Sequence, residues 1–193
     1  MIKIGITGGI GSGKTTVINF FKALDIPAYI ADEKAKALMH KDPVKSELIA
    51  LFGKGSFDKA GALQRAYIAN RVFNTPDLLA RLNAIVHPRV EQDFKDWVQK
   101  QDAPYVVYEA AILFETGRYK TFDYTILVKA PLKTRISRLK KRDHSTEKDI
   151  RKRMDNQWSD EKKEKLADWV INNEDLKATE EQVLRIHDIL SKN

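Results

Sequence analysis

The sequence predicts an α/β protein whose central parallel sheet lies between two layers of helices. Short apolar runs rich in β-branched residues alternate with longer segments whose apolar residues recur at helical spacing. This alternation is typical of parallel strands joined by helices that cover both faces of a sheet. With 193 residues, 42% of them hydrophobic and 32% charged, the chain is large enough to bury one core and has the balance of a globular protein. We therefore expect a single three-layer domain.

The first elements are a strand, a loop and a helix. Residues 2–7 form an apolar, β-branched run that predicts a buried strand. Glycines follow, and apolar residues at helical spacing then predict a helix that begins near Lys14. Residues 26–30 predict a second short strand that ends at Ala31-Asp32. A segment rich in Lys and Ala predicts a helix to about His40.

The middle of the chain, from Asp42 to Gln101, is predicted to be mostly helical. Thr75 and Pro76 have the residue types of an N-cap and a first helical position. The His87-Pro88 step then predicts a boundary between two amphipathic helices. The apolar stripes of these two helices are Leu78, Leu79, Leu82, Ile85 and Val86 in the first, and Val90, Phe94, Trp97 and Val98 in the second.

The last part of the chain returns to strand composition. Residues 105–108, 124–129 and 169–171 are apolar or aromatic runs that predict three further strands. The run Thr179-Glu180-Glu181-Gln182 has the pattern of a capping box and predicts the start of the final helix. The residues expected to be buried on that helix are Val183, Ile186, Ile189 and Leu190.

Composition excludes several classes of site. The sequence has no cysteine, which excludes disulfides, thiolate metal sites and cysteine nucleophiles. Its N-terminus lacks the pattern of a signal peptide, and no run approaches the roughly 20 apolar residues of a membrane span. We expect a cytoplasmic protein without a membrane partner, and no obligate protein partner is evident.

The positive charge is concentrated in one segment. The chain has 34 Lys and Arg against 27 Asp and Glu, a net charge of +7. Residues 133–153 contain ten basic and three acidic residues, so this segment alone accounts for the excess. Such a local excess indicates one anion-handling element, whereas nucleic-acid binders more often spread it over a face. A nucleotide-gated protein that grips RNA or DNA with this segment is the alternative from another class, but the segment lacks interleaved aromatic residues; we expect no nucleic-acid partner.

A phosphate-binding loop is the most specific motif in the sequence. Residues 8–15 fit the pattern G-x-x-x-x-G-K-[ST], with a predicted strand before it and a predicted helix after it. The glycines let backbone N–H groups turn inward around phosphates, and the helix directs its positive end at them. We expect Lys14 to reach the β- and γ-phosphates and the Thr15 hydroxyl to bind Mg²⁺. The expected ATP-binding residues are Gly8, Gly9, Gly11, Ser12, Gly13, Lys14, Thr15 and Thr16.

Absent motifs narrow the class of phosphate-loop protein. There is no Asn-Lys-x-Asp run of a GTPase and no Leu-Ser-Gly-Gly signature of a transport ATPase. Residues 105–109 fit the Walker B pattern only loosely, with Glu109 in place of Asp. These absences favour a small-molecule kinase that uses ATP and Mg²⁺. The residues alone leave the acceptor open, and a nucleoside monophosphate or a small polyol remains an alternative.

The chain resembles the dephospho-CoA kinase family over nearly its whole length. It departs from the family pattern at Ile30, which replaces the first Asp of an Asp-Ala-Asp motif, and at Ala111, which replaces a proline. The markers are the opening run 4–15, Ala31-Asp32, Arg65, His87-Pro88, the run Ala111-Ile112-Leu113-Phe114-Glu115, Arg138, Arg142-Asp143, Arg153-Met154, Gln157, Ala167-Asp168 and Ile171-Asn172-Asn173.

The resemblance implies a three-layer P-loop kinase fold and a reaction. The core would comprise residues 1–40 and 103–193, with a helical acceptor-binding region at about 41–102 and an Arg-rich lid at about 133–157. The implied reaction moves the γ-phosphoryl group of ATP to the ribose 3′-hydroxyl of dephospho-CoA, giving CoA and ADP, the last step of CoA biosynthesis.

The resemblance also implies the site residues. Asp32 is expected to orient the 3′-hydroxyl and take its proton, although an Asp that merely caps the following helix is the alternative. Arg138 and Arg142 are four residues apart, so they share one helix face and are expected to bind the same phosphates, unless that face is simply solvated. The expected catalytic residues are Lys14, Asp32, Arg138 and Arg142, and the expected acceptor-binding residues are Asp32, Arg65, His87, Phe114 and Glu115.

Alternatives remain for three of the acceptor residues. Arg65 fits a structural ion pair as well as an acceptor phosphate. His87 fits a helix-boundary histidine as well as a substrate contact. Phe114 fits the core as well as the acceptor pocket.

Overall fold

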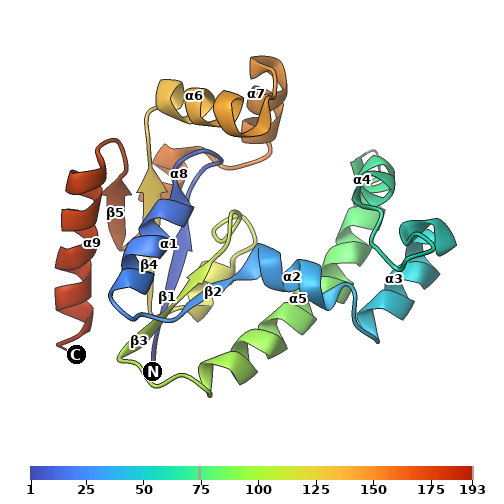
Figure 1. The fold of residues 1–193 in the computed structure, drawn as a ribbon, viewed down its shortest axis with the longest axis horizontal. Helices are drawn as coiled ribbons and strands as arrows, with labels where there is room; N and C mark the ends of the chain where they lie inside the picture. Colours follow the sequence, from blue (N-terminus) through green and yellow to red (C-terminus); the bar gives the residue numbers. More distant parts are fainter. Residues whose placement is uncertain (74, 193) are drawn as a thin grey trace. The chain divides into compact units, whose positions relative to one another are not determined.

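The computed structural model describes residues 1–73 and 75–192, which form two compact units (Figure 1). The first unit is Met1–Ile30 with Gln101–Asn193, and the second is Ala31–Lys100. The first contains β1 (Ile2–Thr7), α1 (Lys14–Ala23), β2 (Ala28–Ile30), β3 (Tyr105–Glu109), η2 (Arg118–Thr121), β4 (Tyr124–Lys129), α6 (Leu132–Asp143), α7 (Glu147–Asp155), α8 (Asp160–Glu164), β5 (Trp169–Asn172) and α9 (Leu176–Leu190). The second contains α2 (Ala31–Leu38), α3 (Val44–Phe52), η1 (Lys54–Ser56), α4 (Arg65–Phe73) and α5 (Pro76–Val98).

The first unit is built on a five-stranded parallel sheet in the order β2-β3-β1-β4-β5, which confirms the predicted α/β class. The central strand β1 pairs with β3 from Ile2 opposite Tyr105 to Ile6 opposite Glu109. Because all strands run the same way, their carboxyl ends meet at one edge, where open α/β sheets bind ligands. The glycine-rich loop, Glu109, the start of α6 and Asn173 all follow or end strands at that edge.

The core of the first unit lies between this sheet and two helices. Ile4, Ile6 and Val128 from the strands are fully buried and belong to the same cluster as residues of α1 and α9. The other face of β1 is covered as well, because a side chain at Gly5 would press on Leu113 and Phe122. Among the described residues, no helix has the length and apolar character needed to cross a bilayer. The helix residues of the cluster are Val17, Ile18, Phe21, Val183, Ile186 and Leu190.

The second strand is shorter than predicted, and Asp32 lies in a helix. β2 covers only Ala28–Ile30, and α2 begins at Ala31, directly after it along the chain. Pro27 cannot donate a ladder hydrogen bond, which limits the strand at its start. Asp32 and Glu33 occupy the first turn of α2, where negative side chains are favourable beside the positive helix end.

The predicted helix boundary at His87-Pro88 is wrong, because α5 is one 23-residue helix with Pro88 inside it. A proline in a helix interior costs about 3 kcal/mol. Each apolar side chain that the helix buries contributes about 1.5 to 3 kcal/mol. Val86, Val90 and Phe94 are 4%, 4% and 6% exposed, so their burial outweighs the proline. Leu79 is 44% exposed and lies outside the buried stripe, contrary to the prediction.

The predicted capping box of the last helix is also wrong. α9 begins at Leu176, and the side chain of its N-cap Asp175 accepts a hydrogen bond from the Ala178 N–H at 2.8 Å. Thr179 is buried inside the helix, and its hydroxyl donates to the Asp175 carbonyl oxygen at 2.6 Å. Val183, Ile186 and Leu190 are buried as predicted, whereas Ile189 is 51% exposed.

Candidate active site

The glycine-rich loop between β1 and α1 has the geometry of an anion cradle. Gly13 is the N-cap of α1 and has a φ of 91°, a left-handed conformation that favours glycine. A Cβ atom at Gly13 would also overlap the side-chain amide of Asn173. The first N–H groups of a helix have no partner within it, and with the helix dipole they favour a bound anion. Lys14 and Thr15 lie in this first turn, as predicted.

Arg138 and Asn173 fix the C-terminal half of the loop from two other elements. The Asn173 amide donates to the carbonyl oxygen of Ser12 at 2.8 Å and to that of Gly13 at 3.3 Å. Arg138 on α6 donates to the same Ser12 oxygen at 3.2 Å and to the Asn173 carbonyl oxygen at 3.0 Å. Helix α6 therefore touches the phosphate loop directly.

Arg135 and Gln157 fix the tip of the loop at Ile10. The Arg135 Nε donates to the Ile10 carbonyl oxygen at 2.9 Å, and its guanidinium pairs with Asp160 at 3.1 Å. The Ile10 N–H donates to the Gln157 side-chain oxygen at 2.8 Å. A side chain at Gly9 would overlap the Arg135 guanidinium, so a glycine there allows this close approach.

The Lys14 side chain contacts the start of the glycine-rich loop. Its Nζ donates to the Gly8 carbonyl oxygen at 3.0 Å and lies 3.6 Å from a Glu109 carboxylate oxygen. The Lys14 and Glu109 side chains are 14% and 11% exposed, so the charges are partly shielded from water. Thr15 is exposed and Thr16 half-buried. Among the described residues, the buried Ser12 hydroxyl has no hydrogen-bond partner.

Arg142 does not share the partners of Arg138, although both lie on α6. Its guanidinium donates to the two carboxylate oxygens of Asp143 at 2.6 and 3.0 Å, and its side chain is 63% exposed. Asp143 also accepts a hydrogen bond from Arg153 on α7 at 2.8 Å. The hydrogen bonds from Arg142 and then Arg153 hold the pKa of the Asp143 carboxyl well below its usual range. This carboxylate therefore joins the ends of α6 and α7.

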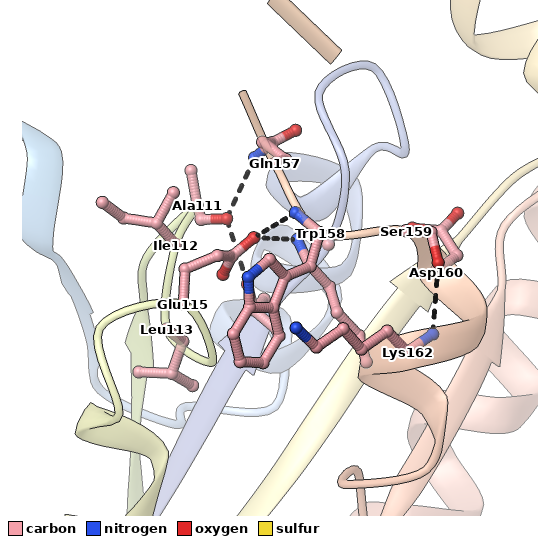
Figure 2. Close-up of polar contacts among 12 residues, drawn as sticks. Ala111, Ile112, Leu113, Glu115, Gln157, Trp158, Ser159, Asp160 and Lys162 are labelled. Carbon is pink, nitrogen blue, oxygen red and sulfur yellow. Dashed lines mark hydrogen bonds and ion pairs between the residues drawn. The ribbon is translucent and has the colours of Figure 1, made fainter. Parts of the chain in front are cut away.

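Phe114 and Glu115 follow β3 and make contacts within the first unit, and Figure 2 shows those of Glu115. Phe114 is 1% exposed and packs on the Tyr119 ring at 5.2 Å. Glu115 accepts a hydrogen bond from the Trp158 backbone N–H at 3.0 Å and pairs with Lys163 at 2.8 Å. Lys163 is fully buried, so Glu115 is its counter-ion in the interior.

Asp32, Arg65 and His87 belong to the second unit, on three different helices. Asp32 is exposed in the first turn of α2, and Arg65 is exposed at the first residue of α4. His87 is half-buried within α5, next to Pro88. His87 is therefore inside a helix and not at its boundary.

The structure adds residues that the predicted site did not include. Arg135, Asn173 and Gln157 contact the phosphate loop, and Glu109 lies beside Lys14. A signal for Arg135 existed, because it lies three residues before Arg138 and hence on the same helix face. Glu109 was the acidic residue of the loose Walker B pattern. In the part of the chain that the structure describes, no group of three or more His, Cys, Asp or Glu residues could hold a metal ion.

Comparisons with known proteins agree on one family. The family model described as dephospho-CoA kinase matches residues 2–178. The chain is 37% identical over 187 residues to the dephospho-CoA kinase of Bacteroides fragilis, covering 96% of this chain and 91% of the relative. It is 40% identical over 179 residues to that of Chlorobium luteolum, covering 89% and 82%.

Solved structures show the same fold. The crystal structure of TT1252 from Thermus thermophilus matches with a TM-score of 0.88 and 34% identity, covering 97% of this chain and 96% of the other. Dephospho-CoA kinase from Campylobacter jejuni matches with a TM-score of 0.72 and 23% identity over 98% and 97%. Shikimate kinase from Aquifex aeolicus, with a TM-score of 0.53 and 15% identity over 97% and 96%, is similar in fold.

Proposed function

Because the chain belongs to the dephospho-CoA kinase family, we propose that its phosphate loop binds ATP and that its other site residues position dephospho-CoA for phosphoryl transfer. The enzyme transfers the γ-phosphoryl group of ATP to the ribose 3′-hydroxyl of dephospho-CoA, which gives CoA and ADP in the last step of CoA biosynthesis. The observation that carries this assignment is a complete phosphate loop in a chain that matches the family over residues 2–178.

The reaction forms one bond and breaks another at the γ-phosphorus. The 3′-oxygen bonds to phosphorus, the bond from phosphorus to the β–γ bridging oxygen breaks, and ADP leaves with that electron pair. Such transfers pass through a loose transition state, so positioning and charge neutralisation supply most of the catalysis. The protein therefore needs a rigid cradle and cations more than it needs a strong base.

The ATP phosphates are proposed to lie in the cradle at the start of α1. Lys14 would exchange its bond to the Gly8 carbonyl oxygen for bonds to the β- and γ-phosphates. The Ser12 hydroxyl, which has no hydrogen-bond partner within the part of the chain that the structure describes, retains hydrogen-bonding capacity in the loop. The proposed ATP-binding set is Gly8, Gly9, Gly11, Ser12, Gly13, Lys14, Thr15 and Thr16.

The residues present fit a Mg²⁺ ion that arrives with ATP. Mg²⁺ takes oxygen ligands, keeps several waters, and is bound through one or two carboxylates and the substrate phosphates, to which the phosphate-loop Ser/Thr is added in P-loop enzymes. The exposed Thr15 hydroxyl at the start of α1 is a suitable oxygen, and the Glu109 carboxylate lies at the same edge of the sheet. When bound, the ion would neutralise charge that develops on the phosphates. We propose Thr15 as its protein ligand.

Asp32 is proposed to orient the 3′-hydroxyl and to accept its proton. A carboxylate is a weak base, so Asp32 would take the proton late, once the new oxygen–phosphorus bond has acidified the hydroxyl. The assignment is supported by the family motif, whose final Asp this residue matches. Ile30 replaces the first Asp of that motif, which leaves Asp32 as its single carboxylate.

Arg138 and Arg142 are proposed to stabilise the transferring group. Arg138 is supported by its contacts with Ser12 and Asn173 at the loop. Arg142 is assigned by its match to the family lid, and it would exchange its bonds to Asp143 for bonds to phosphate. An arginine in this role is worth roughly 10³ to 10⁵ in rate.

Four further residues are proposed on the acceptor side. Arg65 and His87 are proposed to contact dephospho-CoA directly, Arg65 through a phosphate. Phe114 and Glu115 are proposed to line the acceptor pocket. Phe114 is buried and Glu115 partly buried, so they would act mainly through the shape of the pocket. We propose a cytoplasmic enzyme whose small-molecule substrates are ATP and dephospho-CoA, without a nucleic-acid, membrane or obligate protein partner.

The assignment is tested by measuring ADP release with ATP, Mg²⁺ and dephospho-CoA, with AMP, adenosine and shikimate as parallel acceptors. Of the four acceptors, only dephospho-CoA is expected to give turnover, and this turnover should be lost in Lys14→Ala. Turnover with another acceptor in preference to dephospho-CoA would contradict the proposed substrate. Activity that requires added RNA or DNA and falls steeply with salt would favour the nucleic-acid alternative.

A further inference from the structure

The side chain of Gln157 bridges two segments of the first unit that are far apart in the sequence. Its oxygen accepts the Ile10 N–H of the phosphate loop at 2.8 Å. Its nitrogen donates to the Ala111 carbonyl oxygen at 3.0 Å, and Figure 2 shows this second bond. The orientation of the amide is unambiguous, because an N–H group only donates and a carbonyl oxygen only accepts. One side chain thus joins the ATP loop to the segment after β3.

The far end of that segment is held as well. Glu115, four residues after Ala111, accepts the Trp158 backbone N–H at 3.0 Å and pairs with the buried Lys163 at 2.8 Å. Gln157 and Trp158 are neighbours in sequence, so two consecutive residues bind the two ends of the segment 111–115 (Figure 2). The segment therefore cannot shift freely against residues 157 and 158.

The tip of the phosphate loop is held from both ends of the lid. Gln157 follows α7 and binds the Ile10 N–H, whereas Arg135 near the start of α6 binds the Ile10 carbonyl oxygen at 2.9 Å. Asp160 pairs with Arg135 at 3.1 Å and so ties the start of the lid to the segment after it. A movement of the Ile10 peptide when phosphates enter the loop would act directly on Gln157.

We propose that Gln157 is a positioning residue that couples ATP binding in the phosphate loop to acceptor binding at residues 111–115. This inference rests on the proposed function, in which Phe114 and Glu115 line the acceptor pocket. ATP would set the Ile10 peptide, Gln157 would transmit its position to Ala111, and the segment would then bind dephospho-CoA more tightly. Coupling between two ligands is reciprocal, so bound dephospho-CoA must raise the affinity for ATP by the same factor.

The test is a thermodynamic cycle measured by calorimetry. The dissociation constant of dephospho-CoA is measured with and without a saturating non-hydrolysable ATP analogue and Mg²⁺. The dissociation constant of the analogue is likewise measured with and without saturating dephospho-CoA. The coupling ratio is the dissociation constant of one ligand without the other ligand divided by its value with the other ligand present. In the unmodified enzyme, both ratios should be equal and about fivefold or more, the lower range of typical couplings. Asn156→Ala, a change at the exposed neighbouring amide, is the matched control and should keep the ratio.

Two variants separate the halves of the bridge. Gln157→Leu removes both bonds, whereas Gln157→Glu keeps an acceptor for the Ile10 N–H and loses the donor to Ala111. Both should bring the ratio to about one. Because Gln157→Glu keeps the bond to the Ile10 N–H, the affinity of that variant for the ATP analogue alone should change little. A residue with a merely structural role would lower the midpoint or both affinities and leave the ratio unchanged.

Each other outcome overturns the proposal. A ratio of one in the unmodified enzyme means that the sites are not coupled. A ratio that survives in both variants, or is lost only in Gln157→Leu, means that the bond to Ala111 transmits nothing. Failure of dephospho-CoA to bind or react at all would instead contradict the proposed function, so the two failures are distinguishable.

Discussion

Asp32 is the residue on which the proposed proton transfer depends. Asp32→Asn should lower kcat by about 10² to 10⁴ with little change in the KM for ATP, because a general base contributes on that order. Glu33→Gln is the matched control, since it removes the other acidic group of the same helical turn. If Asp32 only stabilises the helix end, the change costs about 0.3 to 1 kcal/mol of stability and leaves kcat intact. Steady-state kinetics with thermal melts distinguishes the two.

The ion pair between the buried Lys163 and Glu115 should contribute to the stability of the fold. Lys163→Met leaves Glu115 partly buried without its counter-ion, which should cost about 3 kcal/mol of unfolding free energy. Lys165→Met, at an exposed position, should cost less than about 0.5 kcal/mol. The double variant Glu115→Leu with Lys163→Met should be more stable than Lys163→Met alone. Urea denaturation measures all three, and a negligible loss in Lys163→Met would mean that Glu115 is solvated.

From the lowered pKa of Asp143 we expect the stability of the contact between α6 and α7 to depend on pH. Arg142 and Arg153 lower its pKa in the folded state, so its contribution to stability is complete above the ordinary aspartate pKa of about 3.9 and declines as pH falls below it. The difference in thermal midpoint between the unmodified enzyme and Asp143→Asn should therefore be constant from pH 7 to about 5 and shrink below about 4. A difference that grows on acidification would contradict the assigned sign.

At the residue scale, local motifs were predictable and distant partners were not. Lys14 and its loop follow from eight consecutive residues whose conformation is set locally. The Arg135 contact with Ile10 spans 125 residues, and the Asn173 contact with Ser12 spans 161. Spacing places Arg135, Arg138 and Arg142 near one helix face but does not specify which of them reaches the loop. Arg135 was therefore missed, and Arg142 was grouped with Arg138.

At the scale of elements, α5 shows that burial overrides a helix breaker. Pro88→Ala should raise the unfolding free energy by up to about 3 kcal/mol, because the alanine restores a backbone donor and relieves crowding in the helix. Pro104 is a residue outside the helices. Pro104→Ala should lower the unfolding free energy by about 0.4 to 1 kcal/mol, because the unfolded chain gains conformational entropy when the proline is lost. Chemical denaturation measures both changes. A loss of stability in Pro88→Ala would show that the helix depends on the proline's shape.

The two wrong helix boundaries have a shared cause. His87-Pro88 and Thr179-Gln182 are genuine local signals for a helix end and a helix start. In α5 the buried side chains on both sides of Pro88 outweigh the local signal. In α9 Asp175 offers a competing cap four residues earlier, and the Thr179 hydroxyl also lies 3.2 Å from the Asn173 side-chain oxygen, a contact that only the folded chain provides. The start of α1 was predictable because the glycine-rich motif before it determines where the helix begins.

At the scale of the whole molecule, the alternation of strands and helices fixed the α/β class but not the strand order. Hydropathy marks a strand as buried without naming its neighbours, so β2-β3-β1-β4-β5 emerges only from the structure. The parallel arrangement explains why the phosphate loop, Glu109, the start of α6 and Asn173 meet, since each ends a strand or follows its carboxyl end.

Nucleotide binding should stabilise the whole fold. At 100 times its dissociation constant, a non-hydrolysable ATP analogue with Mg²⁺ contributes about 2.7 kcal/mol. For a chain of this size, 1 kcal/mol moves the thermal midpoint by about 2 to 4 °C, so a rise of about 5 to 10 °C is expected. Lys14→Ala at the same ligand concentration should show a much smaller rise. An equal rise in that variant would place the nucleotide away from the loop.

The central claim is that this chain phosphorylates the 3′-hydroxyl of dephospho-CoA. The most direct measurement is the product itself, identified by mass and by ³¹P NMR after incubation with ATP, Mg²⁺ and dephospho-CoA. We predict one added phosphoryl group per molecule, located on the ribose 3′-oxygen, with one ADP released for each. An unmodified substrate, or a phosphoryl group on any other hydroxyl, would contradict the account.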